Sequence, residues 1–349
     1  MFDDFPLLKN SIYLNTAYVG LMSQGLYHFR RKYDLDYINK GDHIHMGRHE
    51  IIERARNSIS IFFGSELNHT FVSSNFSSAL RNILKYIPQN SNFLVLEEDY
   101  PSIIDLIEER AFKFHKIPIS ANLEDSILKF LETEKIDVIA VSVVQYISGL
   151  LIDLDFLKKI KQNNPKIIII GDGTQFLGGH VFNFEDSPFD FIASSGYKWL
   201  LSGFGNGLFM VSDNFFKFTK TNESIFLEKI YDGHTDLLGL ESLNYSINSL
   251  LKADFNSLID KKNKLTSLLK KSLKEIGLLD SLSSQRKIHS SIFNIKLNNN
   301  DFKFLIDNNV RCVKRGNGIR VSLHFYNSKQ DVIGFISLLK KLNRDFSLN

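Results

Sequence analysis

The sequence predicts an α/β fold in which a mainly parallel central sheet forms a large domain, followed by a smaller α+β domain. Through the middle of the chain, short apolar runs alternate with amphipathic stretches, which is typical of βαβ units on a parallel sheet. Beyond about residue 250, a long lysine-rich stretch leads into short mixed elements. The length of 349 residues suits about two domains. We expect residues 20–248 to form the large domain, and residues 1–19 with 249–349 to form the small one.

Apolar runs predict the strands of the large domain in order along the chain. The runs are a short one at 71–72, then 93–96, 138–144, 167–170, 189–193 and 207–211. After the first run, apolar residues recur at the i, i+3, i+4, i+7 spacing of one helix face; they are Leu80, Ile83, Leu84 and Ile87. Further helices are predicted over 103–111, 123–131 and 154–160.

The C-terminal third predicts a mixed set of elements. In order, they are a helix over 255–276, a strand over 291–297, a short helix over 302–307, strands around 310–313 and 319–325, and a last helix over 329–342. The chain has no internal repeat and no linker rich in glycine, serine or proline. We therefore expect the two domains to pack tightly against each other.

Polar and aromatic residues follow five of the predicted strands at the point where each strand ends. In an open α/β sheet, ligands bind outside the carboxyl ends of the strands. We therefore expect these residues to meet at one edge of the sheet. Strand by strand, they are Ser77 and Ser78, Tyr100, Gln145 and Tyr146, Asp172 and Gln175, and Ser195 and Lys198.

Two successive strands lead to an acid and to a lysine, and this pair predicts a cofactor. The aliphatic run 167–170 leads to Asp172, where a carboxylate is costly unless it is paired. The next strand leads to Lys198. Pyridoxal phosphate needs a lysine that holds its aldehyde as a Schiff base, and an acid that pairs with its pyridinium nitrogen so that the ring acts as an electron sink. We predict this cofactor, with Lys198 and Asp172 as catalytic residues, which narrows the substrate to amino acids and amines.

Six short motifs, in order over nearly the whole chain, resemble those of class V aminotransferase-fold enzymes, which depend on pyridoxal phosphate. This group includes cysteine desulfurases, kynureninases and isopenicillin N epimerase-like proteins. Each motif alone is weak, but six in register are a strong signal. The resemblance implies the type I fold of pyridoxal phosphate-dependent transferases and a small-molecule amino-acid substrate. The motifs are 13–17, 75–82, 172–175, 195–198, 233–235 and 319–327.

The resemblance implies a cofactor-binding role for residues around Lys198 and Asp172. Gln175 matches the glutamine that hydrogen-bonds the phenolic oxygen of the cofactor, and Tyr100 stands where an aromatic ring stacks on the pyridine. The phosphate is expected to meet hydroxyls and the free backbone N–H groups of a helix N-terminus. The implied phosphate ligands are Ser77, Ser78, Ser195 and Tyr197.

The resemblance also implies residues for the substrate and for a partner subunit. Arg320 matches the arginine that takes the substrate α-carboxylate, for which a guanidinium fork is well suited, and Asn15 is likewise expected to bind substrate. Thr235 resembles the threonine that reaches the phosphate bound by the other subunit. This implies a homodimer with composite active sites.

The single cysteine bears on which reaction follows. Desulfurases carry a nucleophilic cysteine on a loop, whereas Cys312 lies in a strand-like segment with only a short turn before Arg320. We expect a half-buried structural thiol. An aminotransferase or a C–S/β-lyase is therefore favoured, with a cysteine desulfurase as the alternative. A non-catalytic nucleotide-binding α/β protein, with 171–173 as a phosphate loop, is a remote alternative, because no G-x-G-x-x-G opens a helix after the first strand and no Walker A motif is present.

Composition argues against other kinds of partner. The formal charge is +3, with lysine and arginine interspersed among aspartate and glutamate, so we expect no nucleic acid partner. No apolar stretch reaches the roughly 18 residues of a spanning helix, so we expect no membrane partner. The chain starts without a secretory signal, and one cysteine permits neither an intrachain disulfide nor a thiolate metal cluster. We predict a cytoplasmic enzyme without a bound metal.

Overall fold

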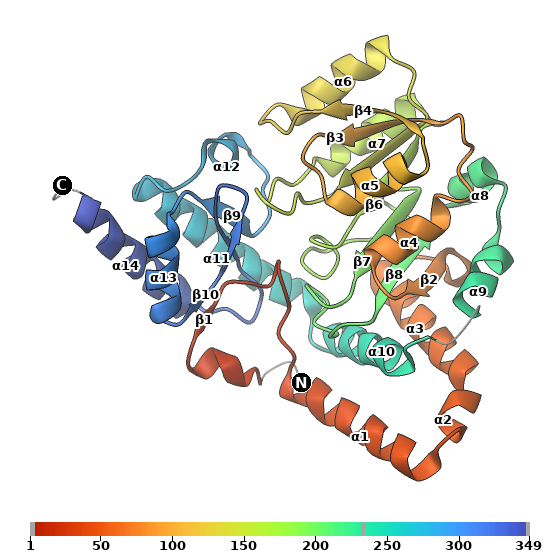
Figure 1. Ribbon diagram of the computed structural model, residues 1–349, viewed down its shortest axis with the longest axis horizontal. Coiled ribbons are helices and arrows are strands. Elements are labelled where there is room, and N and C mark those ends of the chain that lie inside the picture. The colour runs from red at the N-terminus through yellow and green to blue at the C-terminus, as the bar shows by residue number, and fades with distance from the viewer. Residues whose placement is uncertain (1–3, 232–234, 347–349) are drawn as a thin grey trace.

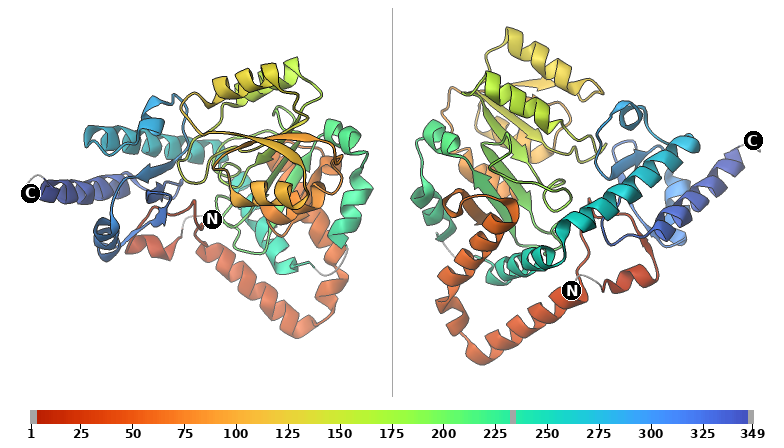
Figure 2. Two further views of the ribbon diagram at one scale, coloured as in Figure 1. Left: turned by 45° about the horizontal axis from the view of Figure 1, so that its top comes forward. Right: turned by 180° about the vertical axis from the view of Figure 1, so that it is seen from behind.

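The computed structural model describes residues 4–231 and 235–346. Figure 1 shows a body built around a central sheet and, beside it, a smaller body of blue elements. The long helix α11 (Phe255–Glu275) starts near the end of α10 (Leu237–Lys252) and runs along the smaller body. The view from behind in Figure 2 shows the same helix leading from one body to the other.

Seven strands form the central sheet. They are β2 (Thr70–Ser73), β3 (Asn92–Leu96), β4 (Lys113–Ile117), β5 (Val138–Ser142), β6 (Ile168–Asp172), β7 (Phe191–Ser195) and β8 (Gly207–Val211). Their order is β2-β8-β7-β6-β5-β3-β4. Neighbouring strands are parallel except that β8 runs antiparallel to both β2 and β7. The predicted mainly parallel sheet is therefore confirmed.

Six of these strands coincide, within two residues at each end, with predicted apolar runs, but β4 does not. It is the edge strand beside β3, and Lys113 and Lys116 are exposed on it. Charged side chains on an edge strand discourage pairing with other chains. They also remove the apolar run by which a strand is recognised, so β4 is missing from the sequence-based prediction.

Helices cover the sheet, and the four predicted in the large domain are confirmed. They are α4 (Phe76–Ile83), α5 (Pro101–Glu109), α6 (Leu123–Thr133) and α7 (Leu154–Asn163). The helix α4 ends at Ile83, so Leu84 and Ile87 of the predicted helix face follow it, and both are still buried. The helical conformation is disfavoured at Ile87, because it precedes Pro88. None of the described helices combines the length and the apolar content that crossing a membrane requires.

Other helices of the large body lie outside the predicted elements. Figure 1 shows α1 (Gln24–Lys40) and α2 (His43–Met46) standing away from the sheet, whereas α3 (Arg48–Phe63) packs on α10 and β2. The remaining elements of the large body are α8 (Asp213–Thr219), α9 (Glu223–Tyr231) and the 3-10 turn η2 (Leu67–His69). A second 3-10 turn, η1 (Pro6–Lys9), contacts the N-terminal strand of the smaller body.

Both faces of the sheet are buried, which explains the uninterrupted apolar runs of its strands. Ile168 and Ile170 belong to one hydrophobic cluster and Ile169 to another, because successive side chains of a strand point to opposite faces. Parallel sheets covered on both faces have near-continuous apolar strands. Polar side chains of these strands are therefore concentrated at the strand ends.

The smaller body contains two further sheets and the predicted C-terminal helices. Its elements are β1 (Ile12–Tyr13), β9 (Ile292–Ile295), β10 (Val310–Arg311), β11 (Val313–Arg315), β12 (Gly318–Ser322), α12 (Ser281–Gln285), α13 (Asn299–Asp307) and α14 (Lys329–Phe346). The order β11-β12-β9 is antiparallel throughout, and β1 pairs with β10 in parallel. The pairing of β1 with β10 brings the N-terminal segment beside this body. The domain limits themselves, 20–248 and 1–19 with 249–349, stay a prediction.

One buried carboxylate ties strands together at the end of the sheet opposite to the predicted site. Asp190, directly before β7, accepts hydrogen bonds from the backbone N–H of Ile169 and from the side chains of Lys161, Ser212 and Asn214. These partners lie on or beside β6 and β8. Removing a buried carboxylate leaves its hydrogen-bond donors buried without an acceptor, which destabilises the fold.

We predict that Asp190→Ala lowers the free energy of unfolding by about 3 kcal/mol, because Lys161 and three other donors lose their acceptor. Urea unfolding followed by circular dichroism measures this value. The matched control is Asp186→Ala, an exposed acid in the same connection, which should stay within about 0.5 kcal/mol of the wild type. Equal effects of the two substitutions would contradict the structural role of Asp190.

Candidate active site

The carboxyl ends of β2, β3, β5, β6 and β7 meet around a cavity of about 390 Å³, as the strand-end residues predict. Seven of the predicted site residues line it: Ser77, Tyr100, Asp172, Gln175, Ser195, Tyr197 and Lys198. Tyr146 lines it as well, whereas the side-chain amide of Gln145 turns away to bond the carbonyl of Glu98. The topology of the sheet therefore brings residues from five separate loops to one place.

Lys198 and Asp172 are both buried at this cavity. The side chain of Lys198 is 8% exposed, and burial lowers the pKa of its amine, while the charge of Asp172 acts in the opposite direction. Asp172 is the last residue of β6, and its Oδ1 accepts a hydrogen bond of 2.8 Å from the backbone N–H of Thr174. Burial raises the pKa of this carboxyl. A lysine with a lowered pKa holds more of its amine in the neutral, nucleophilic form at a given pH.

The N-terminus of α4 points its first turn at the cavity. Its N-cap is Asn75, whose Oδ1 accepts from the backbone N–H of Ser78 at 2.9 Å, while the N–H of Phe76 donates to the Ser195 hydroxyl at 3.0 Å. The Ser77 hydroxyl lies 2.7 Å from that of Ser102. The first N–H groups of a helix have no acceptor within the helix, and here those of Phe76 and Ser78 are taken by Ser195 and Asn75. The N–H of Ser77 and these hydroxyls therefore suit a phosphate.

Ser78 occupies a different position from the predicted one. Its hydroxyl accepts a hydrogen bond from Ser74 on the outer side of α4, and Ser78 is not among the residues that line the cavity in the described chain. The helix starts two residues earlier than the two serines suggest, with Asn75 as its cap. With this start, Ser77 faces the cavity and Ser78 faces away from it.

Two tyrosine rings flank Lys198. Its Nζ lies 5.9 Å from the ring centroid of Tyr100 and 5.5 Å from that of Tyr197. Burial raises the pKa of Tyr197 to about 12, so its phenol keeps its proton at neutral pH and can donate a hydrogen bond. Both rings are therefore close enough to contact a planar ligand attached to this lysine.

Arg320 and Asn15, which are predicted to bind substrate, are not among the described residues that line the cavity, but both carry a buried atom without a partner in the described part of the chain. The Nη1 of Arg320 donates to the carbonyl of Tyr146 at 2.6 Å, but its Nη2 has no hydrogen-bond partner among the described residues. The Oδ1 atom of Asn15 likewise has no hydrogen-bond partner among the described residues. The backbone of Asn15 forms a β-bridge with Ser322 of β12. Buried polar atoms are rarely left unpaired, and a free guanidinium N–H suits a carboxylate.

Two charged residues that act on the pKa values of Lys198 and Asp172, without lining the cavity, have no role in the sequence-based prediction. Burial lowers the pKa of Lys198, and the charges of Arg320 and Arg315 lower it further. The guanidinium carbon of Arg315 lies 5.3 Å from the ring centroid of Tyr18. No ion pair joins it to the described part of the chain. The sequence predicts only a short turn at this position, whereas Arg315 is the last residue of β11.

Asp99 is the second such residue. It is buried, and its carboxylate accepts from the backbone N–H of Tyr100 at 2.7 Å and of Ser142 at 2.9 Å, which joins the ends of β3 and β5. Burial raises the pKa of this carboxyl to about 6. An acid that follows a buried apolar run within a few residues is the pattern that predicts Asp172. Asp99 follows β3 in the same way, so the same pattern could have predicted it.

Thr235 lies directly before α10, half-buried, whereas Gly233 and His234 of its motif lie outside the described residues. Within one chain, Thr235 does not line the cavity. Its predicted contact is with a phosphate bound by a partner subunit, and this stays a prediction.

Cys312 lies between β10 and β11, away from the cavity. Its side chain is 6% exposed and packs in a cluster with Leu14, Val310 and Val321, so it is more deeply buried than the half-buried position predicted. Burial raises the pKa of the thiol to about 12. A structural thiol is the interpretation that this environment favours.

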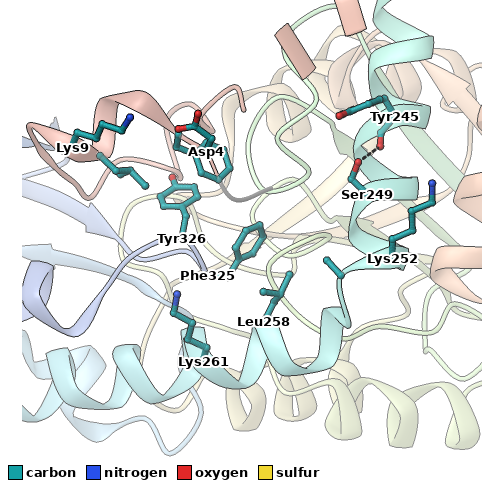
Figure 3. A pocket seen from close by; sticks show the side chains of 12 residues that line it. Asp4, Lys9, Tyr245, Ser249, Lys252, Leu258, Lys261, Phe325 and Tyr326 are labelled. Carbon is teal, nitrogen blue, oxygen red and sulfur yellow. Dashed lines mark hydrogen bonds between the residues drawn. The ribbon is translucent and has the colours of Figure 1, made fainter. Parts of the chain in front are cut away.

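A second cavity, of about 950 Å³, lies at the junction of α10 and α11 with the N-terminal segment (Figure 3). Lys9, Lys252 and Lys261 stand around it, and Phe325 and Tyr326 form part of its wall. It contains none of the strand-end residues. The smaller cavity is therefore the candidate active site, because ligands of open α/β sheets bind at the carboxyl ends of the strands.

Comparisons with known proteins agree with this assignment of the fold. The sequence model of the family described as Aminotransferase class-V matches residues 23–335. A protein of Borreliella burgdorferi named "Probable cysteine desulfurase" is 21% identical over 416 residues, which cover 99% of this chain and 96% of that protein.

Solved structures resemble the whole chain. A cysteine desulfurase from Thermococcus onnurineus NA1 has a TM-score of 0.79 at 18% identity, over 97% of this chain and 96% of its own. A complex of a cystine C–S lyase with cysteine persulfide has a TM-score of 0.82 at 13% identity, over 96% and 98%. Another structure of the lyase holds glycine linked to pyridoxal phosphate. The predicted type I fold is therefore confirmed.

We predict that the Cys312 thiol of the folded protein resists alkylation by iodoacetamide at pH 8.5. An exposed thiol is about half ionised at this pH, whereas the thiol with a pKa raised to about 12 stays protonated and out of reach. Mass spectrometry before and after unfolding in urea measures the difference. Cys312→Ala should lower the free energy of unfolding by about 1–2 kcal/mol. Stoichiometric labelling of the native protein within minutes would refute this assignment.

Proposed function

The chain belongs to the class V aminotransferase family and is a pyridoxal phosphate-dependent enzyme, and we propose that it cleaves a carbon–sulfur bond in an amino acid. The proposed site is the cavity at the carboxyl edge of the sheet. The observation that carries the amino-acid substrate is the buried, unpaired Nη2 of Arg320 near Lys198. The sulfur chemistry is proposed from the relatives, which are named as a C–S lyase and as cysteine desulfurases.

The residues at the cavity fit the cofactor group by group. Lys198 is proposed to bind its aldehyde and Asp172 to hold the proton of its ring nitrogen. Ser77, Ser195 and the backbone N–H of Ser77 would hold the phosphate. When bound, pyridoxal phosphate supplies a sink for the electron pair left at Cα when a proton is removed. Tyr100 is proposed to lie against the ring, and Tyr197 to donate its phenolic hydrogen to the phosphate.

Two residues are proposed to act on the substrate. Arg320 binds the α-carboxylate with its free Nη2, which fixes the amino acid over the cofactor. Lys198, released when the substrate amine takes its place, accepts the Cα proton as a general base, and its lowered pKa suits this task. Expulsion of the sulfur substituent from Cβ, with a proton, would then give sulfide from cysteine or a persulfide from cystine. The unsaturated amino acid that remains would take up one water and give a keto acid and ammonia.

A cysteine desulfurase is the second candidate, because relatives carry that name. In that reaction a protein thiolate takes the sulfur. Cys312 is the only cysteine of the chain, and its burial with a pKa of about 12 argues against this role. The lyase assignment, in which sulfur leaves with a small molecule, is therefore favoured.

A panel of amino acids tests the proposed function. Cystine, cysteine, alanine and glutamate are each incubated with the enzyme, and keto acid, sulfide or persulfide, and ammonia are measured in parallel. Ammonia and keto acid in equal amounts, with sulfur release and with Cys312→Ala active within a few-fold of the wild type, support the lyase. Keto acid without ammonia indicates transamination. Loss of sulfur release in Cys312→Ala, with normal cofactor binding, establishes the desulfurase instead.

We predict that Lys198→Ala keeps the fold but loses the visible absorption of lysine-bound cofactor and at least about a thousandfold in turnover. The variant removes both the covalent anchor and the proposed base. Lys252→Ala, at an exposed lysine on α10, is the control and should behave as the wild type. Absorption spectra, with borohydride trapping of the wild type, give the readout. Normal turnover in Lys198→Ala would end the proposal.

A homodimer with composite sites is also proposed. Large apolar side chains are exposed near the cavity and on the outer helices: Phe204, which lines the cavity, is 63% exposed, and Ile38 on α1 is 78% exposed. Exposed apolar surface beside a site often marks an interface. A cytoplasmic location is proposed from the sequence, whose single cysteine permits no disulfide within the chain.

The expected mass in multi-angle light scattering is twice that of the chain of 40.1 kDa, at concentrations down to those of the activity assay. Phe204→Asp should weaken the dimer, because a charge would be buried at the interface. A fully active monomer at assay concentration would contradict the composite site.

A further inference from the structure

Trp199, the residue after Lys198 and the only tryptophan of the chain, is bonded to a residue of the cavity. Its indole is 1% exposed, and its Nε1 donates to Oε1 of Gln175 at 2.8 Å. The Nε2 of Gln175 donates to the carbonyl of Ala17 at 2.8 Å. An indole N–H can only donate and a backbone carbonyl can only accept, so both ends of the amide are assigned.

Three residues hold Trp199 in place: His324 bonds its backbone carbonyl, and Lys262 and Gly179 contact its indole. His324 Nδ1 accepts from the backbone N–H of Phe325 at 2.7 Å, so its Nε2 carries the hydrogen and donates to the carbonyl of Trp199 at 3.0 Å. Lys262 of α11 places its Nζ 5.8 Å from the indole centroid and donates to the carbonyl of Gly179. A Cβ on Gly179 would lie 2.9 Å from the indole, so the ring packs directly on this backbone.

The ammonium of Lys262 is buried without a carboxylate partner in the described chain. Burial lowers its pKa to about 7. Its interactions are with the Gly179 carbonyl and with the face of the indole, an arrangement in which a cation is attracted to an aromatic ring. Lys262 is therefore fixed between the Gly179 carbonyl and one face of the indole, so it packs against Trp199.

We propose that Trp199 is a positioning residue for the cofactor: its indole N–H locks the amide of Gln175 so that this side chain presents an N–H, and never its carbonyl oxygen, to the ligand. The inference rests on the proposed function, because the ligand is the ring oxygen of pyridoxal phosphate. Of the two hydrogens on Nε2, one is used by Ala17 and the other remains for the cavity that Gln175 lines. Lys262 and His324 hold the indole in place.

The proposal has a direct electrostatic consequence. An N–H donated to the negatively charged ring oxygen stabilises it, whereas a rotated amide would place a carbonyl oxygen against it. Without the indole N–H, the bond from Nε2 to the carbonyl of Ala17 still resists this rotation, but Oε1 of Gln175 loses its donor and the amide is held at one end instead of two. The donor also competes with the proton that the ring oxygen shares with the lysine-bound nitrogen, so its loss should raise the pH at which that proton leaves.

A double-mutant cycle tests the proposal, with Trp199→Phe to remove the donor and Gln175→Leu to remove its acceptor. The readouts are the dissociation constant of pyridoxal phosphate and the pH midpoint of its visible absorption, with thermal unfolding of the cofactor-free proteins as a check of the fold. Trp199→Phe should weaken cofactor binding about tenfold and raise the midpoint. In the Gln175→Leu background, the same substitution should change either readout less than about twofold.

Two outcomes would overturn the proposal: a full tenfold effect of Trp199→Phe in the Gln175→Leu background, or no effect in the wild-type background. Trp199→His, which keeps a ring N–H, guards against misfolding of the first variant and should bind the cofactor within about threefold of the wild type. If it binds as weakly as Trp199→Phe, ring shape rather than the donor matters and the proposal fails. Absence of any visible band in the wild type would instead refute the proposed function.

Discussion

The site depends on one constraint, which is that a parallel sheet with both faces buried has only its strand ends for polar side chains. The register of β6 and β7 pairs Asp172 with Ala193, so that the acid and the loop that carries Lys198 leave the sheet at the same edge. Burial then acts on both groups, lowering the pKa of the amine and raising that of the carboxyl. The strand ends thus supply reactive groups whose protonation the surrounding packing controls.

The other half of the site comes from the smaller body. Arg320 on β12 reaches the carbonyl of Tyr146 at the end of β5, and Asn15 bridges to β12 at Ser322. The backbone N–H of Ala17 donates to the hydroxyl of Ser322, and its carbonyl accepts from Gln175. These contacts join segments that are some 300 residues apart in the chain to a loop of the central sheet. Relative movement of the two bodies would therefore change the surroundings of Arg320 and Asn15.

The charge balance of the cavity fits anionic ligands. Arg315, Arg320 and Lys198 contribute positive charge, and the buried acids Asp172 and Asp99 have raised pKa values. A phosphate and a carboxylate would offset the cations that the chain itself leaves without partners. By contrast, Cys312 sits in an apolar cluster where nothing stabilises a thiolate. The charges around the cavity thus fit the proposed base and the proposed anion-binding groups, while the thiol belongs to the core.

The sequence by itself determined the parallel sheet and the edge that carries the candidate site, because the buried strands are local apolar runs and the strand-end residues follow them. Asp172, Lys198 and Ser195 were predictable for this reason. The tertiary structure decided what local pattern does not contain: β4, whose lysines suit an edge; the start of α4, with which Ser78 faces away; and the bond from Trp199 to Gln175. Such features depend on which elements pack together. The residues that this packing joins lie at sequence separations that follow neither the helix period nor the strand period, so the sequence pattern does not predict them.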